Sequence, residues 1–181
     1  MKYAGIDWSL TSPSVCIYDS SNNKPFHFNS CIISVLNDRS HIIGRRHNVK
    51  IYPHYNWSKP EERYHTLAIH FLPELIQCDV IYLEDYAYAA KGKVFNLAES
   101  TGILKYNLWV SLRSYQTIFP ATVKKFATGK GNANKELMYE AFVEDTDVNL
   151  LDELDAKNIN SPISDIVDSY FICKFAFFNT K

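Results

Sequence analysis

Cysteine is scarce in this sequence, and no cysteine lies close to another. The four thiols of the 181-residue chain form no C-x-x-C pair. Their spacing excludes the usual ligand patterns of structural zinc sites and the disulfide frameworks of small secreted domains. We therefore expect reduced, buried thiols in a cytoplasmic protein. These residues are Cys16, Cys31, Cys78 and Cys173.

A long apolar run is also missing. No stretch approaches the roughly 20 apolar residues that a membrane-spanning helix needs, and the first residues do not resemble a secretion signal. The composition, with 46% apolar and 22% charged residues, is typical of a globular protein rather than a disordered or fibrous one. We expect a single domain over residues 1–181 that is neither exported nor membrane-bound.

Net charge is almost absent, at −1, which by itself argues against a nucleic-acid partner. The total hides an uneven distribution. Between Lys91 and Lys135, eight basic residues accompany one glutamate, which gives a net charge of +7, whereas residues 136–168 hold ten acidic residues and one lysine, which gives −9. Because a basic and an acidic segment cancel, nucleic-acid binding by the basic segment stays open.

Apolar periodicity predicts an α/β fold. Runs at 2–7, 14–19 and 26–36 predict a three-stranded antiparallel meander, and runs at 80–83 and 115–119 predict further strands, parallel to it in a mixed sheet. The Ser-Lys-Pro-Glu sequence at residues 58–61 predicts a capping box and a helix to about residue 77. Helical spacing predicts further helices at 93–113 and from 120, 134 and 161. This order predicts helices on both faces of the sheet.

The segment of about residues 36–57 has a composition of its own. Apolar runs at 41–43 and 49–52 flank a glycine and a basic stretch, which predicts a small hairpin with a basic tip. Arg45 and Arg46 lie at that tip, and aromatic residues are interleaved with the basic ones. We interpret the segment as a basic and aromatic insertion, which either contacts DNA bases or only decorates the hairpin.

Four acidic residues occupy positions where carboxylates can converge. Asp7 and Glu84 end predicted strands, while Asp165 and Asp168 lie three residues apart on one face of the last predicted helix. Partly buried carboxylates are costly unless a cation compensates them. Oxygen ligands without neighbouring His or Cys suit Mg²⁺ or Mn²⁺, and four can hold two such ions about 4 Å apart. Each residue alone is more typical of a turn or a cap, but together they favour a metal site that hydrolyses phosphodiesters.

Basic residues near glycines are candidates for phosphate contacts. Four lysines surround the Gly129–Gly131 loop, although such a group fits a solvated face equally well. The histidines have no ligand spacing, and we assign them no metal role. The candidate DNA-binding residues are Lys91, Lys93, Lys124, Lys125, Lys130, Lys135, Arg45, Arg46, Tyr86 and Tyr88.

In their order along the chain, these motifs resemble the RuvC-type Holliday junction resolvases of the ribonuclease H-like superfamily. The resemblance covers nearly the whole chain except residues of about 36–57, and Trp8-Ser9 stands where bacterial members have Pro-Gly. It therefore implies a divergent member encoded by a phage or virus. The matching segments are Gly5-Ile6-Asp7, Leu83-Glu84, Ala89-Ala90-Lys91, Leu97 to Gly102, Val123-Lys124-Lys125, Gly129 to Lys135 and Asp165-x-x-Asp168.

The resemblance implies an enzyme of DNA recombination and repair, a crossover junction endodeoxyribonuclease. Such an enzyme acts in the cytoplasm of a bacterium or phage-infected cell, binds four-way DNA junctions as a homodimer, and nicks two strands of like polarity. The metal ligands would be Asp7, Glu84, Asp165 and Asp168, holding two Mg²⁺ or Mn²⁺ ions.

The resemblance also implies roles for residues outside the metal site. Lys124 and Lys135 would act as catalytic residues near the scissile phosphate. The helix that contains Leu97 to Leu108 would supply much of the dimer interface. Where bacterial members have an aromatic residue that opens the junction, this chain has Ala87, with Tyr86 and Tyr88 beside it.

Other functions stay open on the sequence alone. A broader branched-DNA or flap nuclease, or an exonuclease of the same superfamily, would share the acidic residues. Gly5-Ile6-Asp7 also resembles the start of ATP-binding domains of the actin and sugar-kinase type, although those usually duplicate the fold and need more than 181 residues. A catalytically silent DNA-binding subunit is a further alternative.

Overall fold

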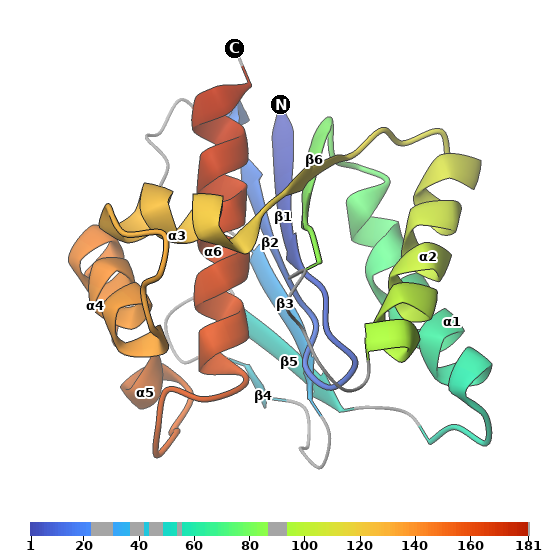
Figure 1. The fold of residues 1–181 in the computed structure, drawn as a ribbon, viewed down its shortest axis with the longest axis horizontal. Coiled ribbons are helices and arrows are strands. Elements are labelled where there is room, and N and C mark those ends of the chain that lie inside the picture. The colour runs from blue at the N-terminus through green and yellow to red at the C-terminus, as the bar shows by residue number, and fades with distance from the viewer. Residues whose placement is uncertain (23–30, 37–41, 44–48, 54–55, 87–93, 181) are drawn as a thin grey trace.

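A seven-stranded mixed sheet forms the centre of the molecule, in the order β4-β5-β3-β2-β1-β6-β7 (Figure 1). The computed structural model describes residues 1–22, 31–36, 42–43, 49–53, 56–86 and 94–180. The strands are β1 (Lys2–Asp7), β2 (Ser14–Asp19), β3 (Cys31–Leu36), β4 (Ile42–Ile43), β5 (Val49–Pro53), β6 (Val80–Glu84) and β7 (Gln116–Ile118).

Strand directions follow the prediction. β2 runs antiparallel to both β1 and β3, which confirms the meander, while β6 is parallel to β1 and β7 is parallel to β6. The insertion extends the sheet at the other edge, where β4 and β5 pair as the predicted hairpin and β5 lies parallel to β3. The predicted basic tip at 44–48 and residues 26–30 of the predicted third strand lie outside the described residues.

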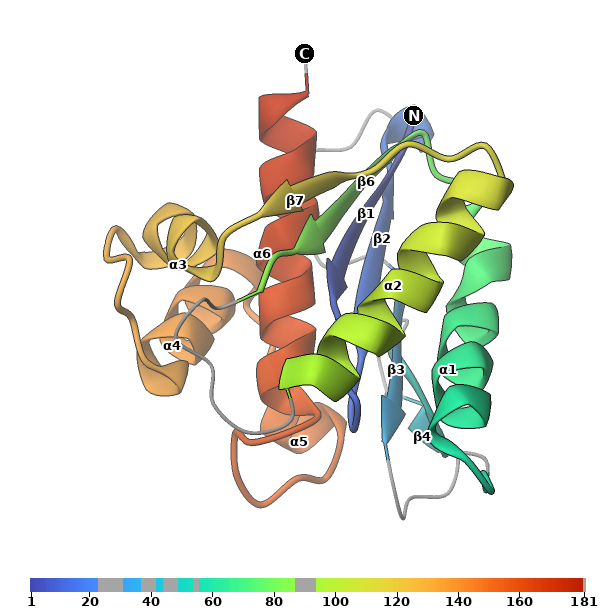
Figure 2. The same ribbon diagram turned by 45° about the vertical axis from the view of Figure 1, so that its right-hand side comes forward.

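Helices cover both faces of the sheet, as predicted (Figure 2). α1 and α2 pack together on one face, while α6 lies along β1 and β2 on the other, with α3 and α4 beside it. None of the described helices is long and apolar enough to cross a membrane. The helices are α1 (Pro60–Leu75), α2 (Val94–Val110), α3 (Pro120–Thr128), α4 (Lys135–Thr146), α5 (Leu150–Glu153) and α6 (Ile163–Asn179), with the short 3₁₀ helix η1 (Ser20–Asn22).

The helices differ from the prediction in two places, the cap at the start of α1 and the presence of α5. The backbone N–H and the hydroxyl of Ser58 both donate to the Glu62 carboxylate at 2.8 Å. The predicted capping partner of Ser58, Glu61, was therefore wrong by one residue. α1 begins after Lys59, so that its third residue, Glu62, is the one whose side chain bonds to Ser58. The sequence does not predict α5, since four residues are too few to show a helical period.

The side chains of β1 point alternately to the two faces of the sheet, where they enter two separate apolar cores. This alternation also determines the face on which Asp7 lies. Ile6 packs among α1 and α2 residues, whereas Tyr3 packs on the α6 side. Gly5 also faces α6, where an added Cβ atom would lie only 2.1 Å from the backbone nitrogen of Cys173. Only glycine allows α6 to approach this closely. The same alternation turns Asp7 toward α6.

Candidate active site

Two acidic side chains emerge side by side from the sheet. Asp7 ends β1 and Glu84 ends β6, and these strands are parallel neighbours in which Ile6 pairs with Leu83. Because side chains alternate along a strand, the next residue of each strand points to the face that α6 covers. The carboxylates of Asp7 and Glu84 therefore meet between the sheet and α6.

The first turns of α6 supply two more carboxylates. Asp165 and Asp168 lie one turn apart, and their helix face continues through Ile172 and Ala176, which are fully buried as predicted. The close contact of α6 with Gly5 holds this face against β1. We call the resulting group the acidic cluster, which consists of Asp7, Glu84, Asp165 and Asp168.

Asp7 is the most deeply placed member of the acidic cluster. Its side chain is buried, with 8% of its surface exposed. Burial raises the pKa of Asp7 well above its usual value, and the negative charges of the other three members raise it further, while Lys135 lowers it. All four carboxylates therefore act on one another electrostatically.

Burial and neighbouring negative charges also raise the pKa values of Glu84 and Asp168. Burial and the charge of Asp168 raise the pKa of Glu84 to about 8, against the opposing charge of Lys124. Burial and the charge of Asp165 raise the pKa of Asp168 to about 6, against both lysines. The two lysines compensate the negative charge only in part, and this part of the site favours additional cations.

Asp165 is positioned by two serines. Burial raises the pKa of Asp165, while hydrogen bonds from the Ser12 and Ser161 hydroxyls lower it. The Oγ atoms of Ser12 and Ser161 also lie 3.1 Å apart, which links the β1–β2 loop to the start of α6. The buried Oδ2 atom of Asp165 has no hydrogen-bond partner among the described residues. A buried acceptor without a donor is costly, so this atom is a ready ligand for a cation.

The residues present fit a hard divalent cation by their chemistry. All four members of the acidic cluster offer carboxylate oxygens, which Mg²⁺ and Mn²⁺ prefer, and one buried oxygen is unpaired. Across the described residues, no group of three or more His, Cys, Asp or Glu side chains is already arranged so that it could hold a metal ion. Binding would therefore require the acidic side chains to draw closer together.

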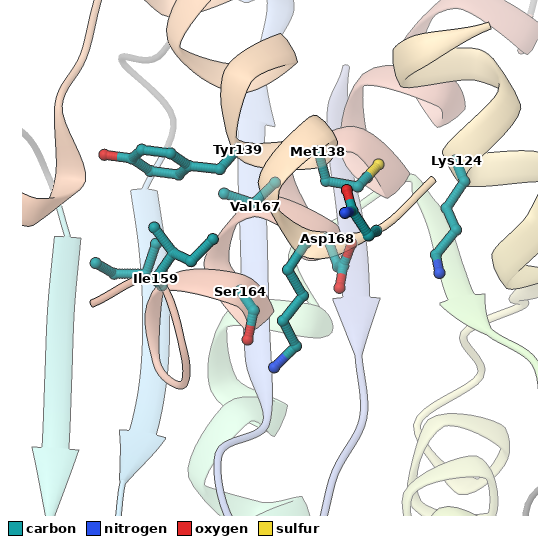
Figure 3. A pocket seen from close by; sticks show the side chains of 10 residues that line it. Lys124, Met138, Tyr139, Ile159, Ser164, Val167 and Asp168 are labelled. Carbon is teal, nitrogen blue, oxygen red and sulfur yellow. The ribbon is translucent and has the colours of Figure 1, made fainter. Parts of the chain in front are cut away.

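Two lysines border the acidic cluster at a pocket. The pocket has a volume of about 120 Å³ and lies between α4 and α6, with Lys124 of α3, Lys135 of α4 and Asp168 among the side chains around it (Figure 3). Asn134 caps α4 by accepting a hydrogen bond from the Leu137 N–H at 3.0 Å, which fixes the position of the first helical residue, Lys135.

The remaining predicted DNA-binding residues are only partly described. Lys125 and Lys130 are exposed on α3 and the loop after it. Tyr86 is half-buried, and the Nζ atom of Lys105 lies 5.2 Å from the centre of its ring. The candidates that lie outside the described residues are Lys91, Lys93, Arg45, Arg46 and Tyr88.

Several residues that support the site were missed by sequence reasoning. Ser12 lies in a predicted turn and Ser161 in a predicted helix start, so that neither position suggests a contact with Asp165. Arg63 of α1 donates to the backbone carbonyl of Leu10 and holds the β1–β2 loop from the other side. Ser12 and Arg63 contact residues that are distant in sequence, and Ser161, although only four residues before Asp165, matches no capping-box spacing, so none of the three leaves a local pattern.

The order of the strands, the placement of α6 and the position of the acidic cluster define an α/β fold of the ribonuclease H-like class and the RuvC type. The structure of Thermus thermophilus RuvC matches it with a TM-score of 0.60 and 15% identity, over 99% of this chain and 98% of that chain. T. thermophilus RuvC in complex with a Holliday junction substrate matches with a TM-score of 0.64 and 14% identity, over 97% and 93%. No protein-family model and no curated protein matches.

We expect the metal-free protein to lose stability as the pH rises from about 4 to about 8. The folded-state pKa values of Asp168 and Glu84 lie above those of the unfolded chain. Their contribution is therefore fully present below the unfolded-state pKa values of about 4, and its loss is complete once the pH has risen past about 6 for Asp168 and about 8 for Glu84, on the order of a few kcal/mol in total. Mg²⁺ should offset this loss, so thermal melting should show a larger Mg²⁺-induced rise in Tm near pH 8 than near pH 5. An equal rise at both pH values would contradict the metal assignment.

Proposed function

We propose that this protein is a metal-dependent, structure-selective DNA endonuclease that resolves four-way junctions by paired nicks. The observation that carries the proposal is the convergence of one buried carboxylate, Asp7, and three half-buried ones from β6 and α6, bordered by two lysines, on a RuvC-type fold. One of the matching structures is itself a complex with a Holliday junction substrate.

The acidic cluster would hold Mg²⁺ or Mn²⁺ through all four of its members. A pair of such ions supplies an activated water and stabilises the leaving oxygen in an in-line displacement at phosphorus. The water oxygen would form the new bond to phosphorus while the bond to the 3′ oxygen breaks, which leaves 5′-phosphate and 3′-hydroxyl ends. Ser12 and Ser161 would keep Asp165 oriented during this step.

Lys124 and Lys135 would bind the phosphate that is cleaved. Both flank Asp168 at the pocket, and both act on the acidic cluster electrostatically. An ammonium group there can offset negative charge that develops on the phosphate oxygens. Lys125 and Lys130 would contact phosphates further along the strand, so the basic segment would recognise the shape of the junction rather than its sequence.

The outer face of α2 supports a homodimer. Leu104 and Leu108 of the predicted interface are fully buried against the chain's own core, so these side chains cannot form it. The opposite side of the helix is instead apolar and exposed, and Trp109 is 70% exposed. A Cβ atom at Gly102 would meet nothing within 4 Å, which leaves room for close approach of a second helix. We call this surface the outer α2 face; it comprises Phe95, Gly102, Tyr106, Trp109 and Val110.

We expect the double variant Tyr106→Ala/Trp109→Ala to be largely monomeric. The two rings lie beside each other, with centroids 6.1 Å apart, and exposed aromatic pairs of this kind are typical interface anchors. Their removal should raise the dimer dissociation constant at least about a hundredfold, measured by sedimentation equilibrium. Ile69→Ala, which removes an exposed apolar side chain from α1, is the matched control. A wild-type protein that sediments as a monomer would contradict the dimer.

A panel of DNA substrates tests the proposed function. The wild-type protein with Mg²⁺ should cleave a synthetic four-way junction faster than a three-way junction, a flap or a linear duplex, at symmetric positions on two strands. Faster cleavage of the flap would favour the broader branched-DNA nuclease. Tight binding of ATP without binding of DNA would favour the kinase-like alternative, and binding without any cleavage would favour a silent subunit.

A further inference from the structure

The pocket beside Asp168 has an apolar interior and a basic border. Met138 of α4 and Val167 of α6 line it, and Ile159 adds a further apolar side chain from the segment before α6 (Figure 3). Ile163 of α6 is also among the lining residues. Lys124 and Lys135 line the same pocket. A ligand that fits this combination has an apolar, flat or compact part and an attached anionic group.

Ser164 gives the pocket one unsatisfied polar group. Its side chain lines the pocket and is only 8% exposed, and its Oγ atom has no hydrogen-bond partner among the described residues. A buried hydroxyl without a partner is destabilising, because it has lost its hydrogen bonds to water. A ligand with a donor or acceptor near Ser164 would therefore gain affinity from this atom.

We propose that this pocket holds the base of one unpaired nucleotide of the cleaved DNA strand, next to the phosphate that the acidic cluster attacks. The inference rests on the proposed nuclease function. The ring system of the base would lie among the apolar side chains, its polar edge would reach the Ser164 hydroxyl, and the attached phosphate would contact Lys124 and Lys135. A volume of about 120 Å³ admits part of one nucleotide and excludes a stacked base pair.

This assignment gives a physical reason for selectivity toward branched DNA. A base inside a duplex must leave its stack and its partner before it can enter such a pocket, and this cost is least where the base is already unpaired. Nucleotides at a branch point meet that condition most easily. The protein would thus select branched over duplex DNA beside the reacting phosphate itself, in addition to recognising the overall shape of the junction.

Fluorescence of 2-aminopurine, an adenine analogue that brightens when it is unstacked, tests the pocket without cleavage. Junctions with the analogue on either side of the cleaved phosphate would be bound to the protein in Ca²⁺. We expect one position to brighten several-fold with the wild-type protein. Ile159→Phe, which narrows the pocket from a half-buried position, should abolish the increase and slow cleavage in Mg²⁺ by about tenfold or more. Ile69→Phe on α1, across the sheet, is the matched control and should behave as the wild type does.

The variant Ser164→Ala tests the polar contact while the pocket stays open. It should reduce the difference in cleavage rate among the four bases at the brightened position by about tenfold, since the hydrogen bond that distinguishes base edges is lost. Equal fluorescence with the wild type and Ile159→Phe, or base preferences unchanged in Ser164→Ala, would overturn the pocket assignment alone. A wild-type protein that neither binds nor cleaves branched DNA would overturn the nuclease function and this inference with it.

Discussion

Asp7→Asn should reduce cleavage of a four-way junction by about a thousandfold or more. Asp7 is the most buried of the four carboxylates and is influenced by all three others. Asparagine keeps the shape of the side chain but removes one anionic oxygen ligand, and the loss of several kcal/mol of stabilisation of the reacting phosphate corresponds to this factor. Single-turnover rates on a synthetic junction with Mg²⁺ measure the effect.

The fold should survive this change. Replacement of this acidic group should make the metal-free protein more stable near pH 8, because burial, and next the negative charges of its neighbours, raise the pKa of Asp7 in the folded state. Asp79→Asn is the matched control, since Asp79 is exposed at the opposite end of the same strand pair, where it accepts from the Lys2 N–H at 2.8 Å. Cleavage by Asp7→Asn at the wild-type rate would show that the acidic cluster is not the active site.

Gly5→Ala should destabilise the protein by about 3 kcal/mol or more, equivalent to roughly 10 °C in Tm. The added Cβ atom would lie 2.1 Å from the Cys173 nitrogen and 2.5 Å from the Ser169 carbonyl oxygen. Both are backbone atoms of α6, so no side-chain rotation relieves the overlap and the helix must move away from β1. Chemical denaturation followed by circular dichroism measures the loss.

Activity should fall with stability in Gly5→Ala, because the same displacement carries Asp165 and Asp168 away from Asp7. Gly102→Ala is the control for folding of the single chain, since its added methyl group meets no atom within 4 Å. A Gly5→Ala protein as stable as the wild type would mean that α6 does not pack on β1 as described here.

Much of the fold is predictable because its signals are local. Each strand of the meander carries its own apolar run, and Pro60 and Pro120 mark helix starts. The fit between Gly5 and α6 is different, because it joins residues 168 positions apart and depends on the packed structure rather than on any local period. The same holds for the parallel pairing of β3 with β5, since nothing in either run determines its neighbour.

The acidic cluster is predictable in part for a related reason. The ends of parallel strands meet at one edge of a sheet, and a spacing of three residues places Asp165 and Asp168 on one helix face, so that the chain pattern itself brings these carboxylates together. The Ser12 contact arises only when the β1–β2 loop, which is distant in sequence, packs against α6, and the unpaired Ser164 hydroxyl depends on how the packed chain encloses it. The role of the acidic cluster as metal ligands, and of the serines as their supports, stays a prediction.

Anomalous diffraction from a crystal soaked in Mn²⁺ tests the metal site most directly. We predict strong density between Asp7 and Asp168, bordered by Glu84 and Asp165, with room for a second ion. Density at this place in the wild type, and its loss in Asp7→Asn, would establish the site on which the proposed nuclease activity depends. The absence of any Mn²⁺ between Asp7 and Asp168, with the four carboxylates turned away from one another, would contradict it.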